Sequence, residues 1–263
     1  MPSSSAGRVS REKRGHIMLI GLDRPAKRNA FDFAMLEDLV LALGEYERDD
    51  NARCALVFAH GDHFTAGLDL ASVGDTFKKG WKVPAGAMDP WGTFGGDRLT
   101  KPLIVAVRGY CYTIGIELML AADINLCASN TRFAQMEVQR GIFPFGGATL
   151  RLHQVAGWGN AMRWLLTGDE FDAHEAYRLG LVQEVLAPED LLPRAIWLAE
   201  RVAAQAPLGV RATLASARQT LDEGEKAAAA SLPGTAQRLL ATEDAQEGLR
   251  AMLERREGHF KGK

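Results

Sequence analysis

The sequence predicts an α/β fold built on a parallel β-sheet with helical crossovers. Short continuous apolar runs, such as residues 53–60 and 103–109, alternate with helical patterns. This alternation is typical of strands that are buried on both faces. After Pro188 the pattern is helical to the end of the chain. The length of 263 residues suits one large domain or a core with an appendage.

The N-terminal elements are predicted from charge, from an apolar run and from residues that break or cap regular structure. Residues 1–14 include a basic cluster, and we expect a flexible, solvated tail there. The apolar run at 16–22 predicts the first strand. Pro25 then interrupts regular structure, and we expect Asp32 to cap the helix that follows it.

The middle of the chain contains a long irregular segment and then a dense set of short elements. Residues 71–98 are rich in Gly, Pro, Trp and Phe, and a loop of that length is usually a lid or a binding loop. The strand at 103–109 precedes a short helix. Further strands are expected at 124–129, 131–135 and 181–186, and helices at 147–157, 159–168 and 172–180.

The composition excludes several classes of protein. The net charge of −2, with both signs interspersed, argues against a nucleic-acid groove or a polybasic membrane patch. Cys54, Cys111 and Cys127 lie in apolar runs and predict reduced core residues rather than disulfides. Because we find no secretory h-region and no apolar run near the about 18 residues of a membrane span, we expect a cytoplasmic protein.

Two glycine turns are the first candidates for chemistry. Gly67 and Gly115 each allow a sharp turn between a strand and a helix. Such turns would leave the N–H groups of Leu68 and Ile114 free, as the first donors of a helix are. Two converging donors form an oxyanion hole. The alternative is that both are ordinary strand-to-helix turns.

Two glutamates are the second set of candidates. Glu117 follows Ile114 by three residues, so a helix returns it to about the same face. Its neighbours are apolar or small, and a carboxylate there is costly to bury unless it is paired, protonated or used. Glu137 taken alone could be an exposed loop acid. Two carboxylates in one apolar pocket would raise at least one pKa, which suits acid–base chemistry near neutrality.

Other chemical signatures are weak. His60, Asp62 and His63 have a spacing that metals can use, but no further ligand follows at a sensible interval, so we expect no metal site. The sequence has no nucleophile elbow, no P-loop and no G-x-G-x-x-G fingerprint.

Six segments, in order, give the chain a resemblance to the crotonase (enoyl-CoA hydratase/isomerase) superfamily over nearly its whole length. They are LDRPAKRNAFD, HFTAGLDL, KPLIVAVRGYCYTIGIELMLAADINLCA, TRFAQMEVQRGIFPFGGATLRL, LTGDEFDAHEAYRLGLVQEVL and LERREGHF. The resemblance implies a ClpP-like spiral of ββα units with a helical trimerisation region. We therefore expect a tail at 1–14, a spiral core at 15–200 and an oligomerisation region at 201–263.

The resemblance also assigns residues by position. It places the oxyanion-hole N–H groups at Leu68 and Ile114 and the catalytic acids at Glu117 and Glu137. Coenzyme A and the acyl group are expected near the following residues: Lys27, Asn29, Ala30, Ala66, Gly67, Leu68, Asp69 and Gly115. Asp69 could instead cap a helix or order its loop.

Two positions depart from the family pattern. Residues 113–115 are Thr-Ile-Gly where many relatives carry three glycines, so a side chain projects from Ile114. Met136 stands where proline often precedes the second glutamate. Neither change removes a reacting group.

The activity that the resemblance implies is reversible syn addition of water to a trans-2-enoyl-CoA, with no cofactor beyond the coenzyme A of the substrate. Alternatives are double-bond isomerisation, another acyl-CoA reaction such as hydrolysis or carbon–carbon cleavage, and a non-catalytic binding protein. The expected assembly is a homotrimer or a dimer of trimers. Candidates to line the acyl pocket, or else to pin the loop to the core, are Trp81, Pro84, Met88, Trp91 and Phe94.

Overall fold

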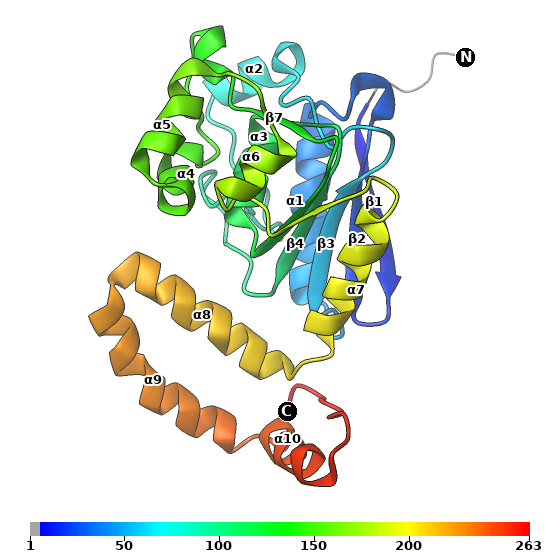
Figure 1. Ribbon diagram of the computed structural model, residues 1–263, viewed down its shortest axis with the longest axis vertical. Coiled ribbons are helices and arrows are strands. Elements are labelled where there is room, and N and C mark those ends of the chain that lie inside the picture. The colour runs from blue at the N-terminus through cyan, green and yellow to red at the C-terminus, as the bar shows by residue number, and fades with distance from the viewer. Residues whose placement is uncertain (1–5) are drawn as a thin grey trace.

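The computed structural model describes residues 6–263 and contains two sheets surrounded by helices (Figure 1). The larger sheet has the strand order β1-β2-β3-β4-β6-β9, and every neighbouring pair is parallel except β1 and β2. Its strands are β1 (Arg8–Arg14), β2 (Ile17–Asp23), β3 (Cys54–Ala59), β4 (Leu103–Val107), β6 (Ile124–Ala128) and β9 (Glu184–Leu186). The smaller sheet contains β5 (Tyr110–Tyr112), β7 (Arg132–Ala134) and β8 (Phe171–Asp172).

Twelve helical segments lie between and beyond these strands in the described part of the chain. They are η1 (Pro25–Lys27), α1 (Phe33–Arg48), α2 (Leu70–Lys78), α3 (Ile114–Ala121), η2 (Glu137–Arg140), α4 (Ala148–Ala156), α5 (Trp158–Thr167), α6 (Ala173–Arg178), α7 (Leu191–Ala203), α8 (Pro207–Glu223), α9 (Glu225–Leu240) and α10 (Glu243–Glu254).

Residues 8–14 are strand β1, so the predicted flexible tail is wrong over this stretch; residues 1–5 lie outside the described part. Each residue of β1 pairs with one of β2, from Arg8 opposite Asp23 to Arg14 opposite Ile17. The strand lies at the sheet edge, where charged side chains are tolerated and discourage pairing with other chains. Two of its basic side chains also form ion pairs, Arg8 with Asp23 and Lys13 with Asp49.

Helices cover both faces of the larger sheet, which explains the continuous apolar strands. Ala55 and Val57 of β3 pack in the cluster that contains α1, whereas Cys54 and Leu56 pack in the cluster that contains α7. Successive side chains of a strand point to opposite faces, so a strand between two helical layers is apolar at every position. Cys54, Cys111 and Cys127 are free and buried.

The segment predicted as an irregular loop contains α2 at its start. This helix buries only Val73, so the sequence carries little helical periodicity. The rest of the loop is fastened by Asp89, which is fully buried and accepts hydrogen bonds from the N–H groups of Trp91, Gly92 and Phe94.

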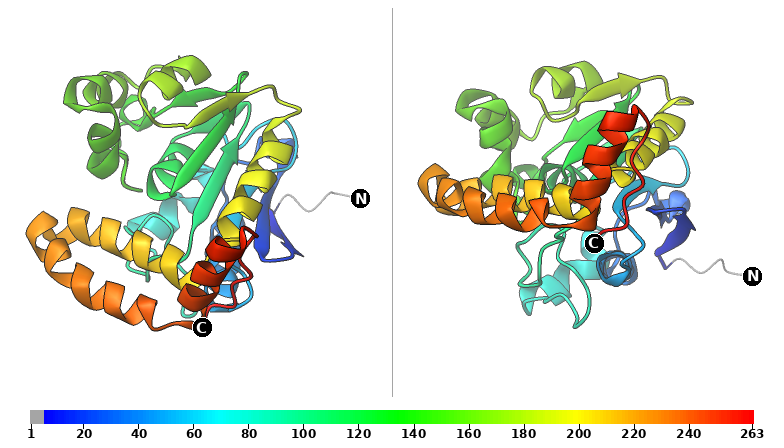
Figure 2. Two further views of the ribbon diagram at one scale, coloured as in Figure 1. Left: turned by 60° about the horizontal axis from the view of Figure 1, so that its bottom comes forward. Right: turned by 90° about the horizontal axis from the view of Figure 1, so that it is seen from below.

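The C-terminal helices project away from the core (Figures 1 and 2). Helix α7 still packs against the sheet, but α8 has no buried residue and α9 buries only Ala228. Large apolar side chains are exposed along these helices, namely Leu221, Leu232, Leu240, Leu249, Met252 and Leu253. Among residues 6–263, no helix is long and apolar enough to cross a membrane.

Asp32 ties the N-terminal segment to α1 and gives a direct test of this part of the fold. Its buried carboxylate accepts hydrogen bonds from the N–H groups of Gly7 and Met35, and it pairs with Arg24 at 3.3 Å. Asp32→Ala removes a helix cap and leaves buried donors unpaired, so we expect a loss of about 2–4 kcal/mol in the free energy of unfolding. Urea denaturation measures it.

Asp172→Ala is the matched control, because Asp172 caps α6 through one hydrogen bond, from the N–H of Glu175. We expect that substitution to cost about 1 kcal/mol. An equal or smaller loss for Asp32→Ala would contradict the role assigned to its buried contacts.

Candidate active site

The turn after β3 leaves one backbone donor free. Phe31 donates its N–H to the carbonyl of Gly67 and accepts from the N–H of Asp69, both at 2.8 Å. In this parallel bridge the N–H of Leu68 points away from Phe31. It has no acceptor among residues 6–263. Gly67 has φ 98°, and a Cβ there would collide with the side chain of Thr113, so this turn requires glycine.

The second free donor lies at the start of α3. The first hydrogen bond of this helix runs from the N–H of Glu117 to the carbonyl of Thr113, at 3.1 Å. The N–H of Ile114 precedes it and has no acceptor within the described part of the chain. Thr113 has φ 51° and ψ −113°, a strained conformation for a β-branched residue, and its hydroxyl does not cap the helix.

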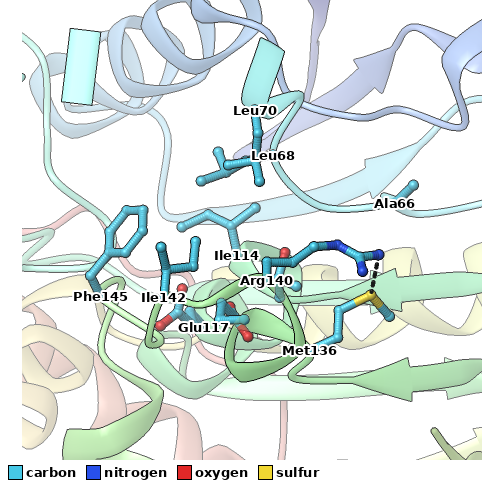
Figure 3. Close-up of a pocket in the computed structure, with 11 residues that line it drawn as sticks. Ala66, Leu68, Leu70, Ile114, Glu117, Met136, Arg140, Ile142 and Phe145 are labelled. Atoms are coloured by element: carbon cyan, nitrogen blue, oxygen red, sulfur yellow. Dashed lines mark hydrogen bonds between the residues drawn. The ribbon is translucent and has the colours of Figure 1, made fainter. Parts of the chain in front are cut away.

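The two turns meet at one cavity of about 150 Å³ (Figure 3). It is lined by Ala66, Leu68, Leu70, Thr113, Ile114, Glu117, Met136, Glu137, Arg140, Ile142 and Phe145. The structure thus brings together the two donors and the two acids that the sequence singled out. The guanidinium group of Arg140 lies on one side of the cavity, and the apolar side chains of Ile142 and Phe145 lie on the other (Figure 3).

Glu117 is held as a buried carboxyl group in a cradle of backbone. Its side chain accepts the N–H of Ala148 at 3.1 Å, and a Cβ on Gly146 would collide with it. Burial raises the pKa of Glu117 to about 7, while the N–H groups of residues 146–148 and the charge of Arg151 oppose this rise. These N–H donors favour the ionised form, so Glu117 suits the role of base.

Glu137 is buried, so it is not the exposed loop acid that was the alternative. It begins the short helix η2, and its residue is 7% exposed. Its Oε2 has no hydrogen-bond partner among the described residues. Burial raises the pKa of Glu137 to about 7, and the nearby charge of Glu117 acts in the same direction. A carboxyl group with fewer donors around it retains its proton more readily, so Glu137 suits the role of acid.

Most of the other candidate residues support the turns and do not line the cavity. Asn29 is fully buried; its Nδ2 donates to the carbonyls of His60 and His63, and its Oδ1 accepts the N–H of Arg24. Asp69 pairs with Arg24 at 3.0 Å. A Cβ on Gly115 would collide with the side chain of Thr65. Of the predicted coenzyme A contacts, Ala66 and Leu68 line the cavity, whereas Lys27, Ala30 and Gly67 do not.

The two histidines of the weak metal pattern have other contacts. His63 receives the N–H of Tyr110 at Nδ1, and Nε2 of His60 lies 2.7 Å from the hydroxyl of Ser10. Within the part of the chain that the structure describes, no group of three His, Cys, Asp or Glu side chains is placed to hold a metal ion.

None of the five loop candidates suggested for the acyl pocket lines the cavity, but Trp91 and Phe94 contact residues that do. Trp91 is fully buried and donates its Nε1–H to the carbonyl of Ile114. Trp81 and Phe94 form an aromatic cluster with Phe77. Sequence analysis missed the lining residues Leu70, Thr113, Arg140, Ile142 and Phe145. Their closeness to the four candidates along the chain was a signal that could have found them.

Comparison with known proteins gives the chain its family. Residues 12–263 match the family model described as enoyl-CoA hydratase/isomerase. The chain is 34% identical to "Enoyl-CoA hydratase EchA19" of Mycobacterium tuberculosis over 257 residues, 96% of each chain. It is 33% identical to "2,3-dehydroadipyl-CoA hydratase" of Escherichia coli, covering 97% of this chain and 98% of the relative.

Solved structures agree. A probable enoyl-CoA hydratase/isomerase from Mycobacterium abscessus superimposes with a TM-score of 0.95 and 50% identity, over 98% of this chain and 100% of that one. Enoyl-CoA hydratase from Mycobacterium tuberculosis gives a TM-score of 0.87 at 33% identity, over 97% and 99%. These matches confirm the predicted crotonase-type α/β fold. The chain therefore belongs to the enoyl-CoA hydratase/isomerase family.

Proposed function

We propose that the chain catalyses the reversible addition of water to a trans-2-enoyl-CoA, giving a 3-hydroxyacyl-CoA. The observation that carries the proposal is one cavity lined by two buried carboxyl groups and by two residues whose backbone N–H groups have no acceptor among residues 6–263. Full-length similarity to relatives named as hydratases, including "Crotonyl-CoA hydratase" of Syntrophomonas wolfei at 31% identity, supports the same reaction.

The N–H groups of Leu68 and Ile114 bind the thioester oxygen. Negative charge grows on that oxygen as the β-carbon is attacked, and donors fixed in advance stabilise it without reorganisation. The N–H of Ile114 also lies at the positive end of the α3 dipole.

Glu117 and Glu137 hold the attacking water between them, and each transfers one proton. Ionised Glu117 takes one proton from the water, whose oxygen bonds to C3 of the enoyl group. The C2–C3 π electrons move toward the thioester, and protonated Glu137 delivers a proton to C2. Glu117 then holds the proton taken from the water and Glu137 is ionised, so a proton passes from Glu117 back to Glu137 through the next bound water before another turnover. Because the two groups interact, their titrations belong to the pair. Two proton-handling groups favour hydration over isomerisation, which needs only one.

The substrate supplies coenzyme A, and no other cofactor takes part in these steps. Coenzyme A lies at the Ala66 end of the cavity, near Lys27, Asn29 and Ala30, with Gly67, Asp69 and Gly115 shaping the turns that hold the thioester. The three buried free cysteines suit a reducing compartment, so we place the enzyme in the cytoplasm.

The C-terminal region, residues 201–263, forms the contacts of a homotrimer or of a dimer of trimers. Its support is the apolar surface of α8, α9 and α10, which the core does not cover. On α10, Leu249, Met252 and Leu253 are spaced to share one face, and each is more than half exposed.

Replacing either acid by its amide tests the mechanism. Glu137→Gln and Glu117→Gln keep the side-chain shape but cannot transfer the proton, so kcat on crotonyl-CoA should fall by about 10²–10⁴-fold. Binding of saturated butyryl-CoA should stay roughly intact. Loss of absorbance from the conjugated thioester reports hydration, and product analysis detects a shifted double bond.

Glu257→Gln is the matched control, because Glu257 is exposed and remote from the cavity. Leu68→Ala and Ile114→Ala should be much milder than the acid variants, since their donors are backbone groups. Near-normal hydration by Glu137→Gln would remove its role, and a shifted double bond without added water would assign an isomerase.

The assembly is tested by mass in solution. Each chain weighs 28.6 kDa, so sedimentation should give about 86 kDa for a trimer or twice that for a dimer of trimers. Leu249→Asp combined with Leu253→Asp places two charges on the α10 face and should lower the mass. The pair Leu249→Met and Leu253→Met should not. A wild-type mass of one chain at micromolar concentration would contradict the proposal.

A further inference from the structure

Phe145 lines the catalytic cavity at the end away from Arg140 (Figure 3). Phe145 is followed directly by Gly146, whose backbone N–H contacts the carboxylate of Glu117. The same loop therefore holds Glu117 and supplies the aromatic end of the cavity. Arg140 extends its side chain the other way, toward Met136 and Ala66 (Figure 3). The cavity thus has a charged end and an aromatic end.

Phe145 is itself supported from behind. Its ring centroid lies 5.3 Å from that of Phe77 in α2 and 6.3 Å from that of Phe94. Trp81 packs on both of these rings, at 5.8 Å and 5.1 Å. Contacts of this kind between aromatic rings add to the stabilisation from burial. The wall is therefore one face of a packed cluster, and moving Phe145 disturbs several contacts.

The volume in front of this wall is small. A cavity of about 150 Å³ has room for a molecule the size of benzene, roughly six non-hydrogen atoms. The thioester oxygen, the four carbons of a crotonyl group and the attacking water already amount to that number. A longer chain that runs toward this end of the cavity would have to displace Phe145.

We propose that this site is specific for short acyl groups of about four carbons and that Phe145 is the residue that sets this limit. The inference rests on the proposed function, because it takes the cavity as the acyl site. Close packing explains the selectivity: in an apolar pocket one added methylene changes kcat/KM by about 10–200-fold. None of the five loop residues suggested from the sequence lines the cavity, and of these Phe94 packs directly behind Phe145.

The test compares chain lengths in hydration and in binding. Purified wild type, Phe145→Ala and Phe145→Leu are assayed with trans-2-butenoyl-CoA and trans-2-octenoyl-CoA. Calorimetry with butyryl-CoA and octanoyl-CoA measures binding without turnover. We expect the wild type to favour the four-carbon substrate by at least about tenfold in kcat/KM, and Phe145→Ala to lower that ratio by about tenfold or more. Phe145→Leu should lie between them.

Phe143→Ala is the control, because Phe143 packs edge-on against the outer side of the cluster, its ring centroid 6.5 Å from that of Phe145, but is itself 62% exposed and does not line the cavity. Its chain-length ratio should match that of the wild type. Equal rates or affinities for both lengths in the wild type would overturn the inference, as would an unchanged ratio in folded Phe145→Ala. If that variant fails to fold, the wild-type profile and Phe145→Leu decide.

The experiments distinguish a failure of the acyl-length inference from a failure of the hydratase assignment. Selective binding of butyryl-CoA that Phe145→Ala relaxes, without hydration of any enoyl-CoA, would leave the acyl-length inference standing and remove the hydratase assignment. Hydration of both lengths at equal efficiency would do the reverse.

Discussion

Two carboxyl groups buried in the wall of one cavity are the constraint on which the rest of the site depends. Glu117 and Glu137 are 2% and 7% exposed, and leaving both ionised there would cost desolvation and repulsion. The structure offsets this cost more for Glu117 than for Glu137. Glu117 receives backbone N–H groups, whereas Glu137 has an oxygen without a partner in the described chain. In the proposed mechanism this asymmetry suits Glu117 to the role of base and Glu137 to the role of proton donor.

The fold supplies the backbone that makes the asymmetry possible. Strand β3 leads through residues 60–67 into the turn of Leu68, and β5 leads into α3, so the two residues with free N–H groups line one cavity. The sheet is covered by α1 on one face and α7 on the other, which keeps these strand ends rigid. The segment after β7, which contains η2, adds Glu137, Arg140 and Phe145 to the lining around these two residues.

Local patterns predicted the parallel sheet and the helix capped by Asp32. The four candidates at 68, 114, 117 and 137 came from the resemblance together with local patterns, and their roles stay predictions. Sequence analysis failed where the deciding contacts are distant along the chain. The charges of residues 8–14 indicate a tail until Asp23 and Asp49 are placed beside them. Phe145 becomes a wall only when α2 brings Phe77 behind it. Thr113 shows no sign in sequence of its positive φ.

The most direct test of the central claim is a pH titration of both carboxyl groups by ¹³C NMR of selectively labelled glutamate, with Glu117→Gln and Glu137→Gln for assignment. The account predicts midpoints for Glu117 and Glu137 near 7, well above the ordinary 4.5. It also predicts that removing Glu117 lowers the pKa of Glu137, since the charge of Glu117 helps to raise it. Two independent titrations near 4.5 would show solvated acids and would contradict the account.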